Sequence, residues 1–140
     1  MKKIIAFLFT LSMIAPSFAD EWKVIYTDDV WFATHSKKQN LGNDLVQLWT
    51  VFCVFGDVMI QESQYDCSSG RSRNLRTLFM DNDGFHPAPQ STIKWSEAPI
   101  PGTFVMKRAN LACGKINGQF RINVENTLDL PKKVKQYLGK

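Results

Sequence analysis

Residues 58–81 read VMIQESQYDCSSGRSRNLRTLFMD, and this stretch decides the fold class. Two runs rich in apolar and strand-favouring residues, 58–67 and 73–81, flank a Ser-Ser-Gly turn at 68–70. The connection between them is far too short for the crossover that parallel strands require. The stretch therefore predicts an antiparallel β-hairpin.

Further strands on both sides of the hairpin predict a sheet of about six strands. Residues 22–26 and 30–33 form a first short pair across a polar turn, and residues 44–55 form a long strand rich in β-branched and aromatic side chains. Gly56 interrupts the chain before the hairpin begins. After a loop that contains glycine and prolines, residues 91–95 are expected to form a sixth, short strand.

The pattern changes to that of a helix at residues 103–114. Thr103 is a candidate N-cap, and Gly114 is placed to end a helix of about three turns. The expected apolar face consists of Phe104, Val105, the Lys107 stem, Ala109, Leu111 and Ala112. A sheet with an exposed apolar face and a single helix must bury one against the other. We therefore expect an α+β fold, a single antiparallel sheet of about six strands with one C-terminal helix packed on it.

The first 19 residues are typical of a secretory signal peptide. Lys2 and Lys3 precede an apolar run from Ile4 to Ile14, and small residues follow near position 19. The run is shorter than the roughly 20 apolar residues that span a bilayer. It contains no cysteine, so we expect an exported protein that is not a lipoprotein. The mature chain is expected to begin near Asp20. We expect it in the periplasm, at the cell surface or secreted. Export to an oxidising compartment makes disulfide formation plausible.

The chain contains three cysteines, Cys53, Cys67 and Cys113. Cys67 ends a strand and Cys113 lies at the end of the helix, so a bond between them would tie the helix to the sheet. Cys53 lies in the middle of the long strand, where we expect a small buried hydrophobic residue. The alternative is that Cys53 is a reactive thiol or forms an intermolecular disulfide, which would give a dimer.

The sequence does not favour an enzyme. The chain has two histidines, His35 and His86, and it lacks the Gly-x-Ser-x-Gly, His-Glu-x-x-His and Cys-x-x-Cys motifs. The Asp-Asn-Asp-Gly stretch at 81–84 lacks the glutamate that completes an EF-hand loop, so it is interpreted as a turn. We expect no catalytic residues, no metal and no cofactor.

An ordered set of short motifs resembles the surface-adhesin protein E family of Gram-negative bacteria. The resemblance covers about residues 21–114, which we treat as one domain, 20–114. It rests on Glu21-Trp22, Leu48-Trp49-Thr50-Val51-Phe52, Gln64-Tyr65-Asp66-Cys67, Lys94-Trp95, Pro101-Gly102 and Leu111-Ala112-Cys113. The resemblance implies a six-stranded antiparallel sheet with the C-terminal helix tied to its concave face by a Cys67–Cys113 disulfide. It also implies that the protein binds host matrix or plasma proteins. The chain departs from the family in its missing lipid-attachment cysteine, in Cys53 and in its basic tail.

Two binding roles follow. One is an exported, non-enzymatic module that binds an extracellular host protein, and the alternative is a periplasmic inhibitor or accessory protein acting on an envelope partner. Five basic residues expected to be exposed would suit an anionic partner in either role: Arg71, Arg73, Arg76, Lys107 and Arg108. A solvated strand edge and helix face is the alternative interpretation. Nucleic acid is not expected, because the net charge of +4 falls to +2 once Lys2 and Lys3 are removed.

Residues 115–140 form a basic tail. They hold six basic and two acidic residues, and Pro131 is well placed to begin a short helix. Such a helix would carry Val134, Tyr137 and Leu138 on one face and Lys132, Lys133 and Lys135 on the others. The tail is either a frayed, solvated terminus or a docking element for a partner or, weakly, an anionic membrane surface. We expect the folded core to end at Gly114.

Overall fold

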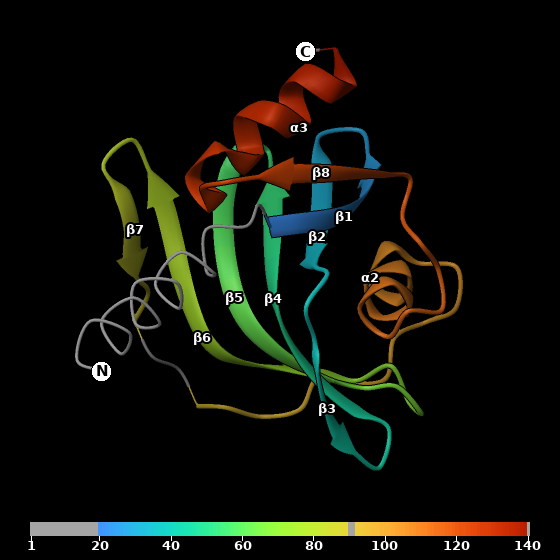
Figure 1. The fold of residues 1–140 in the computed structure, drawn as a ribbon. Coiled ribbons are helices and arrows are strands. Elements are labelled where there is room, and N and C mark those ends of the chain that lie inside the picture. The colour runs from blue at the N-terminus through green and yellow to red at the C-terminus, as the bar shows by residue number, and fades with distance from the viewer. Residues whose placement is uncertain (1–19, 90–91, 140) are drawn as a thin grey trace, which may run out of the picture.

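The computed structural model describes residues 20–89 and 92–139 (Figure 1). The signal peptide expected at 1–19 lies outside the described residues. The elements, in chain order, are β1 (Asp20–Thr27), β2 (Val30–His35), β3 (Gln39–Gly42), β4 (Leu45–Val54), β5 (Asp57–Asp66), β6 (Ser72–Asp81), β7 (Gly84–Pro87), α2 (Phe104–Ala112), β8 (Phe120–Val124), the 3-10 turn η2 (Thr127–Asp129) and α3 (Leu130–Leu138).

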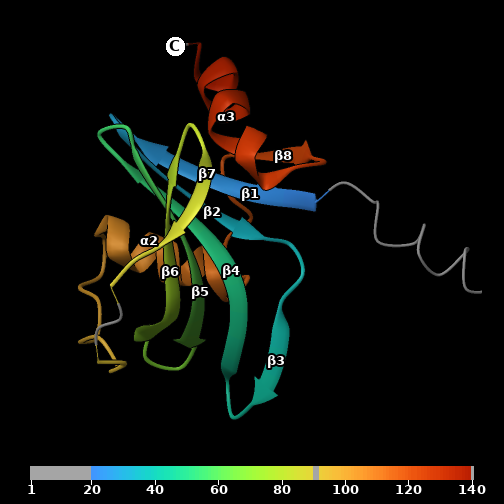
Figure 2. The same cartoon turned by 90° about the vertical axis from the view of Figure 1, so that its left-hand side faces the viewer.

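The strands form one antiparallel sheet in the order β7-β6-β5-β4-β2-β1-β8, with β3 pairing β4 outside this path. The hairpin expected at 58–81 is confirmed as β5 and β6, and the first short pair is confirmed as β1 and β2. Figures 1 and 2 show that the sheet curves strongly, with β1 and β8 turned away from the direction of β4 and β5. The expected fold class, an antiparallel sheet with a helix packed on it, is confirmed.

The strand count and one strand position differ from the expectation. The described part of the chain has eight strands rather than six, because β3, β7 and β8 were not foreseen. Residues 92–95 form no strand, and residue 91 lies outside the described residues. This segment is held beside β6 by Ser96, whose N–H donates to the Ser72 carbonyl (2.7 Å) and whose Oγ accepts from the Ser72 N–H (3.0 Å). Contacts through one residue hold a segment in place without building a ladder of strand hydrogen bonds.

Both faces of the sheet are buried, each against a different helix. On β4, the even-numbered Val46 and Leu48 face α2, while the odd-numbered Val51 and Cys53 face α3. A strand that is buried on both faces has apolar residues at nearly every position, which explains why residues 44–55 are mostly apolar. Figure 2 shows α2 on one side of the sheet and α3 at one end of the other side.

The helix α2 begins and ends where the sequence predicts. The Thr103 Oγ1 accepts from the Met106 N–H (3.3 Å), and Gly114 follows the helix with a φ of +76°. Its buried residues are Ala109, Leu111 and Ala112, so the expected apolar face was too broad: Val105 is exposed.

A Cys67–Cys113 disulfide joins the end of β5 to the C-cap of α2, as the resemblance implied. Close to it, the Lys115 ammonium donates to the Cys67 carbonyl (2.8 Å). The end of α2 is therefore fixed to the sheet by a covalent bond and by a hydrogen bond from the chain that follows it.

The folded chain does not end at Gly114. Strand β8 pairs with β1, and its residues alternate buried and exposed from Phe120 to Val124. The helix expected at Pro131 is present as α3, but it is not frayed: Leu130 and Val134 are fully buried in the core. The expected boundary between 114 and 115 is corrected, since residues 120–138 complete the same sheet and core. Within the described residues, no helix is long and apolar enough to cross a membrane.

Candidate binding surface

Two rows of polar and aromatic side chains cross β4, β5 and β6 on the sheet face that α3 covers only at one end. The strand register sets Gln47 opposite Gln64 and Gln64 opposite Arg73 in one row. It sets Trp49 opposite Glu62 and Glu62 opposite Arg76 in the next. Together with Trp95, which lies over the first row, these six residues form what we term the arginine–tryptophan surface.

A β-bulge places the two arginines on the same face. The pairing steps from Glu62–Arg76 to Ser63–Asn74, so Leu75 is an extra residue on β6. In an unbroken strand, residues three apart point to opposite faces, because the side-chain period is two. The bulge shifts that period by one, and Arg73 and Arg76 both project from the face that carries Glu62 and Gln64.

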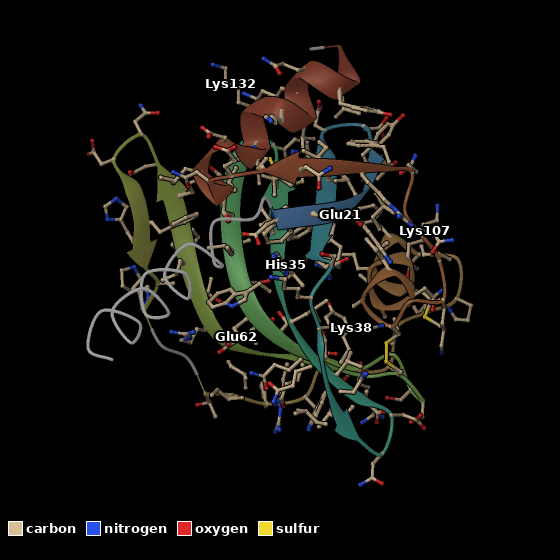
Figure 3. The ribbon with its side chains drawn as sticks, in the orientation of Figure 1. Glu21, His35, Lys38, Glu62, Lys107 and Lys132 are labelled. Carbon is tan, nitrogen blue, oxygen red and sulfur yellow. A yellow bond between two sulfur atoms is a disulfide. The ribbon has the colours of Figure 1, made fainter. Side chains whose placement is uncertain are left out.

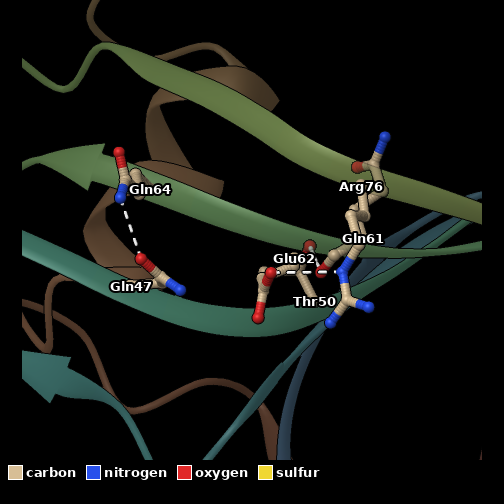
Figure 4. A network of polar contacts seen from close by, with 6 residues as sticks. All are labelled: Gln47, Thr50, Gln61, Glu62, Gln64 and Arg76. Atoms are coloured by element: carbon tan, nitrogen blue, oxygen red, sulfur yellow. Dashed lines mark hydrogen bonds and ion pairs between the residues drawn. The ribbon is translucent and has the colours of Figure 1, made fainter. Parts of the chain in front are cut away.

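Arg73 is held by an indole ring and by an amide. Its guanidinium carbon lies 4.5 Å from the centroid of the Trp95 ring, and its Nε donates to the Gln64 Oε1 (2.7 Å). The Gln64 Nε2 in turn donates to the Gln47 Oε1 (2.8 Å), as Figure 4 shows. Since Gln64 is buried, this chain of hydrogen bonds orients Arg73 from below.

Arg76 is held in the same way by an indole ring and a carboxylate. Its guanidinium carbon lies 5.0 Å from the Trp49 ring centroid, and its Nε donates to the Glu62 Oε1 (3.3 Å; Figure 4). The Arg76 side chain is 61% exposed, so this ion pair contributes little to stability. Its main effect is to fix the direction of the guanidinium.

Among residues 20–89 and 92–139, no hydrogen bond or ion pair engages the terminal amino groups of Arg73 or Arg76, so within this part of the chain they can face a ligand. In each case the Nε–H is used within the protein, and the flat face rests on an indole. A guanidinium oriented in this way presents paired N–H groups that match the geometry of a carboxylate. The surface can therefore bind anions on a partner by directed hydrogen bonds.

The other basic residues predicted to bind a partner are not brought to this surface. Arg71 is exposed in the turn between β5 and β6. Figure 3 shows Lys107 on α2 and Lys132 on α3, both well away from Glu62. Lys133 donates to the Asn123 carbonyl (3.2 Å), and Lys135 lies beside Cys53 at the far end of the sheet.

Arg108 is not an exposed basic residue, which corrects the expectation. It is half-buried between α2 and the sheet, with its guanidinium carbon 4.5 Å from the Phe52 ring centroid and 5.5 Å from that of Phe32. Its Nε is buried and has no hydrogen-bond partner among the described residues. The nearby Tyr65 is also buried, and burial raises the pKa of its hydroxyl to about 12, against the smaller opposing effect of the Arg108 charge.

The two histidines lie apart, each beside an aspartate. The His35 Nε2 lies 3.0 Å from the Asp20 Oδ1, and the His86 Nε2 lies 2.9 Å from the Asp81 Oδ1. Asp81 also accepts from the backbone N–H of Asp83, which lowers the pKa of the Asp81 carboxyl and confirms the turn expected at 81–84. Among residues 20–89 and 92–139, no three His, Cys, Asp or Glu side chains gather in a way that could hold a metal ion.

Cys53 is buried and unpaired, as expected for a small core residue. Burial raises the pKa of its thiol, the largest of several influences that include the Lys135 charge, which lowers it. A thiol with a raised pKa is mostly protonated at neutral pH and is a poor nucleophile.

Sequence reasoning named Arg73 and Arg76 but missed the partners that orient them, Trp49, Glu62 and Trp95. The alternation of β4 and β5 could have placed Trp49 and Glu62 on one face once the hairpin register was assumed. Nothing local to residues 92–96 indicates that Trp95 returns to β6, because that contact depends on the path of the intervening loop.

The chain matches no protein-family model, no curated protein and no solved structure. The relation to the surface-adhesin protein E family therefore rests on the sequence motifs and remains a prediction.

Proposed function

We propose that this chain is an exported, non-enzymatic binding module that recognises an acidic segment of an extracellular protein through the arginine–tryptophan surface. The carrying observation is that Arg73 and Arg76 lie on one face, each stacked on an indole and held at its Nε. Fixing these side chains before binding reduces the side-chain entropy lost when a partner binds. The resemblance to the adhesin family supports a host matrix or plasma protein as the partner.

Export is supported by the signal-like leader and by the Cys67–Cys113 disulfide, since such bonds persist in oxidising compartments. Leu130 and Val134 of the C-terminal segment are buried within the protein, so these two apolar residues are not available to dock a partner. We therefore assign partner binding to the face of β4, β5 and β6.

Binding can be measured by biolayer interferometry on a panel of purified matrix and plasma proteins and on a short poly-glutamate peptide. The double variant Arg73→Gln, Arg76→Gln is expected to lose binding at least tenfold, and the wild-type affinity should fall as salt is raised. Arg121→Gln is the matched control, because Arg121 is also an ion-paired sheet arginine, 3.8 Å from Glu21, but lies on β8. Equal losses in both variants would contradict a dedicated surface.

Location separates the two binding roles. Protease treatment of intact cells should digest the protein if it is surface-exposed, and fractionation should show whether it is confined to the periplasm. A purely periplasmic protein would overturn the host-binding role and favour an inhibitor or accessory protein for an envelope partner. N-terminal sequencing of the mature chain is expected to begin near Asp20.

A further inference from the structure

A cavity lies between α2, β1 and residues 116–119, on the face of the sheet opposite the arginine–tryptophan surface. It has a volume of about 400 Å³ and opens to solvent. Pockets that bind small ligands measure roughly 300–1,000 Å³, so this cavity is large enough for one. Figure 1 shows the chain after α2 running beside the helix to the start of β8. We term this site the α2–β1 cavity.

Three residues of α2 line the cavity at intervals of three positions. Phe104, Lys107 and Asn110 therefore lie along one side of the helix. Phe104 is half-buried against the core beneath α2, and Lys107 is exposed. Within the part of the chain that the structure describes, no hydrogen bond or ion pair engages the Lys107 ammonium or the Asn110 side-chain amide. Both groups can therefore face a ligand.

Residues 116–119 form the opposite wall and are fixed to β1. The Gln119 N–H donates to the Val24 carbonyl (2.7 Å), and the Gln119 Oε1 accepts from the Tyr26 N–H (2.6 Å). Gly118 has a φ of +83°, and a Cβ at this position would lie 3.0 Å from the Val24 carbonyl oxygen, so this close approach requires glycine. The wall is therefore formed before binding, and a ligand does not have to order it.

The cavity combines an apolar floor with a single charge. The floor consists of Ile25, which is buried, and of Phe104 and Ile116, which are half-buried. Of the described residues that line the cavity, Lys107 alone is charged. Asn117 is exposed on the rim and adds a second side-chain amide that no described residue engages.

The charged residues next to the cavity along the chain do not oppose an anion. Arg108 and Lys115 are direct neighbours of lining residues, and both are cations. On β1 the nearest acidic residue along the chain is Asp28, which lines a different cavity, beside Trp31 and Cys53. The α2–β1 cavity is therefore suited to a ligand that joins an anionic group to an apolar one.

We propose that the α2–β1 cavity binds the C-terminal residue of a peptide, with the apolar side chain on the floor and the carboxylate on the Lys107 ammonium. A C-terminal residue carries a carboxylate, a side chain and a peptide group within a few bonds of one another. The side-chain amides of Asn110 and Asn117 each offer an N–H and a C=O, which can pair with the C=O and N–H of that peptide group.

The size of the cavity and its place in the fold agree with this assignment. A cavity of about 150 Å³ lined by apolar side chains holds a benzene ring, so the α2–β1 cavity has room for a phenylalanine side chain. The arginine–tryptophan surface lies on the other face of the sheet, so the two sites can be occupied together. The assignment goes beyond the proposed function and gives Lys107 a ligand of its own.

Titration of the mature chain with N-acetyl-L-phenylalanine tests the site, with binding followed by NMR chemical-shift changes of the amides in isotope-labelled protein. We expect changes at residues 104–110 and 116–119, with a Kd of roughly 1 mM for a probe of this size. Three related probes each lack one recognised group. N-acetyl-L-phenylalaninamide lacks the carboxylate, N-acetylglycine lacks the apolar side chain, and 3-phenylpropionate lacks the peptide group. Each should bind at least about fivefold more weakly.

Lys107→Gln is the decisive variant, because Lys107 is exposed and its replacement should leave the melting temperature unchanged. We expect this variant to raise the Kd for N-acetyl-L-phenylalanine about tenfold and to remove the preference for the acid over its amide. Lys132→Gln, at an exposed lysine on α3, is the matched control and should change neither quantity.

Three results would overturn the proposal. One is a wild-type chain that shows no shift changes at the highest soluble probe concentration. The second is equal binding of the acid and its amide, or of the acid and 3-phenylpropionate. The third is a set of changes confined to β4, β5 and β6, which would assign the carboxylate to Arg73 and Arg76 instead. Poly-glutamate binding by those two arginines is measured separately, so the two proposals fail independently.

Discussion

Phe120 on β8 and Tyr137 on α3 stack face to face, with ring centroids 4.0 Å apart and ring planes 11° apart. The contact joins the last strand to the last helix. The ring centroid of Tyr26, on β1, lies 5.9 Å from the ring centroid of Phe120. The C-terminal segment is therefore part of the folded domain, attached to β1 by strand pairing and by ring contacts.

Loss of the C-terminal packing should destabilise the protein. Leu130→Ala is expected to lower the free energy of unfolding by about 2–5 kcal/mol, because it opens a cavity at a fully buried position. Lys132→Ala, an exposed change on the same helix, should stay within about 0.5 kcal/mol. Urea denaturation followed by tryptophan fluorescence measures both. If deletion of residues 130–140 left the melting temperature unchanged, the described packing of α3 would be wrong.

The disulfide should behave as one energetic unit. Cys67 and Cys113 are 46 positions apart, and the chain-entropy model assigns a loop of that size about 4 kcal/mol of stabilisation. Cys67→Ala and Cys113→Ala should each cost a similar amount, and the double variant should cost no more than either one, since each removes the same bond. Thermal denaturation of the three variants measures this. Additive losses would show that the two side chains contribute separately.

Tyr65 should make the protein sensitive to alkali. In the folded protein the pKa of the Tyr65 hydroxyl is about 12, above the ordinary value of 10. As the pH rises, this hydroxyl therefore loses its proton at a lower pH in the unfolded chain than in the folded protein. Stability from the buried hydroxyl is complete below pH 10 and falls as the pH rises towards 12, by up to roughly 2–3 kcal/mol. Tyr65→Phe should flatten the pH dependence of urea denaturation between pH 9 and 11.5. An unchanged slope in that variant would rule out Tyr65 as the cause.

Cys53 should react slowly with alkylating reagents in the native protein and rapidly once the protein is unfolded. Cys53 is 5% exposed, and burial raises the pKa of its thiol, so both access to the sulfur and the thiolate population are low. Mass spectrometry after timed iodoacetamide treatment, with and without urea, measures the two rates. Fast native labelling would mean that the cavity beside Trp31 admits the reagent.

The local elements could be predicted because their signals lie within a few residues. The hairpin at 58–81 follows from a short turn between two strand-like runs, and α2 follows from Thr103 and Gly114 at its two ends. The pairs at 22–33 and the burial of Cys53 also follow from local pattern. The errors occur where the decisive contact is far away along the chain: β8 needs β1, and the segment at 92–96 needs Ser72.

The candidate surface divides in the same way. The sequence by itself determined the composition of the strands, the caps of α2 and the presence of arginines on β6, because these depend on local backbone preferences and side-chain period. Only the tertiary structure decided that Leu75 forms a bulge, that Arg76 joins Arg73 on one face, and that Trp95 returns to stack on Arg73. The physical reason is that register, bulges and long-range packing minimise the free energy of the whole sheet, and no single strand contains the information about its neighbours.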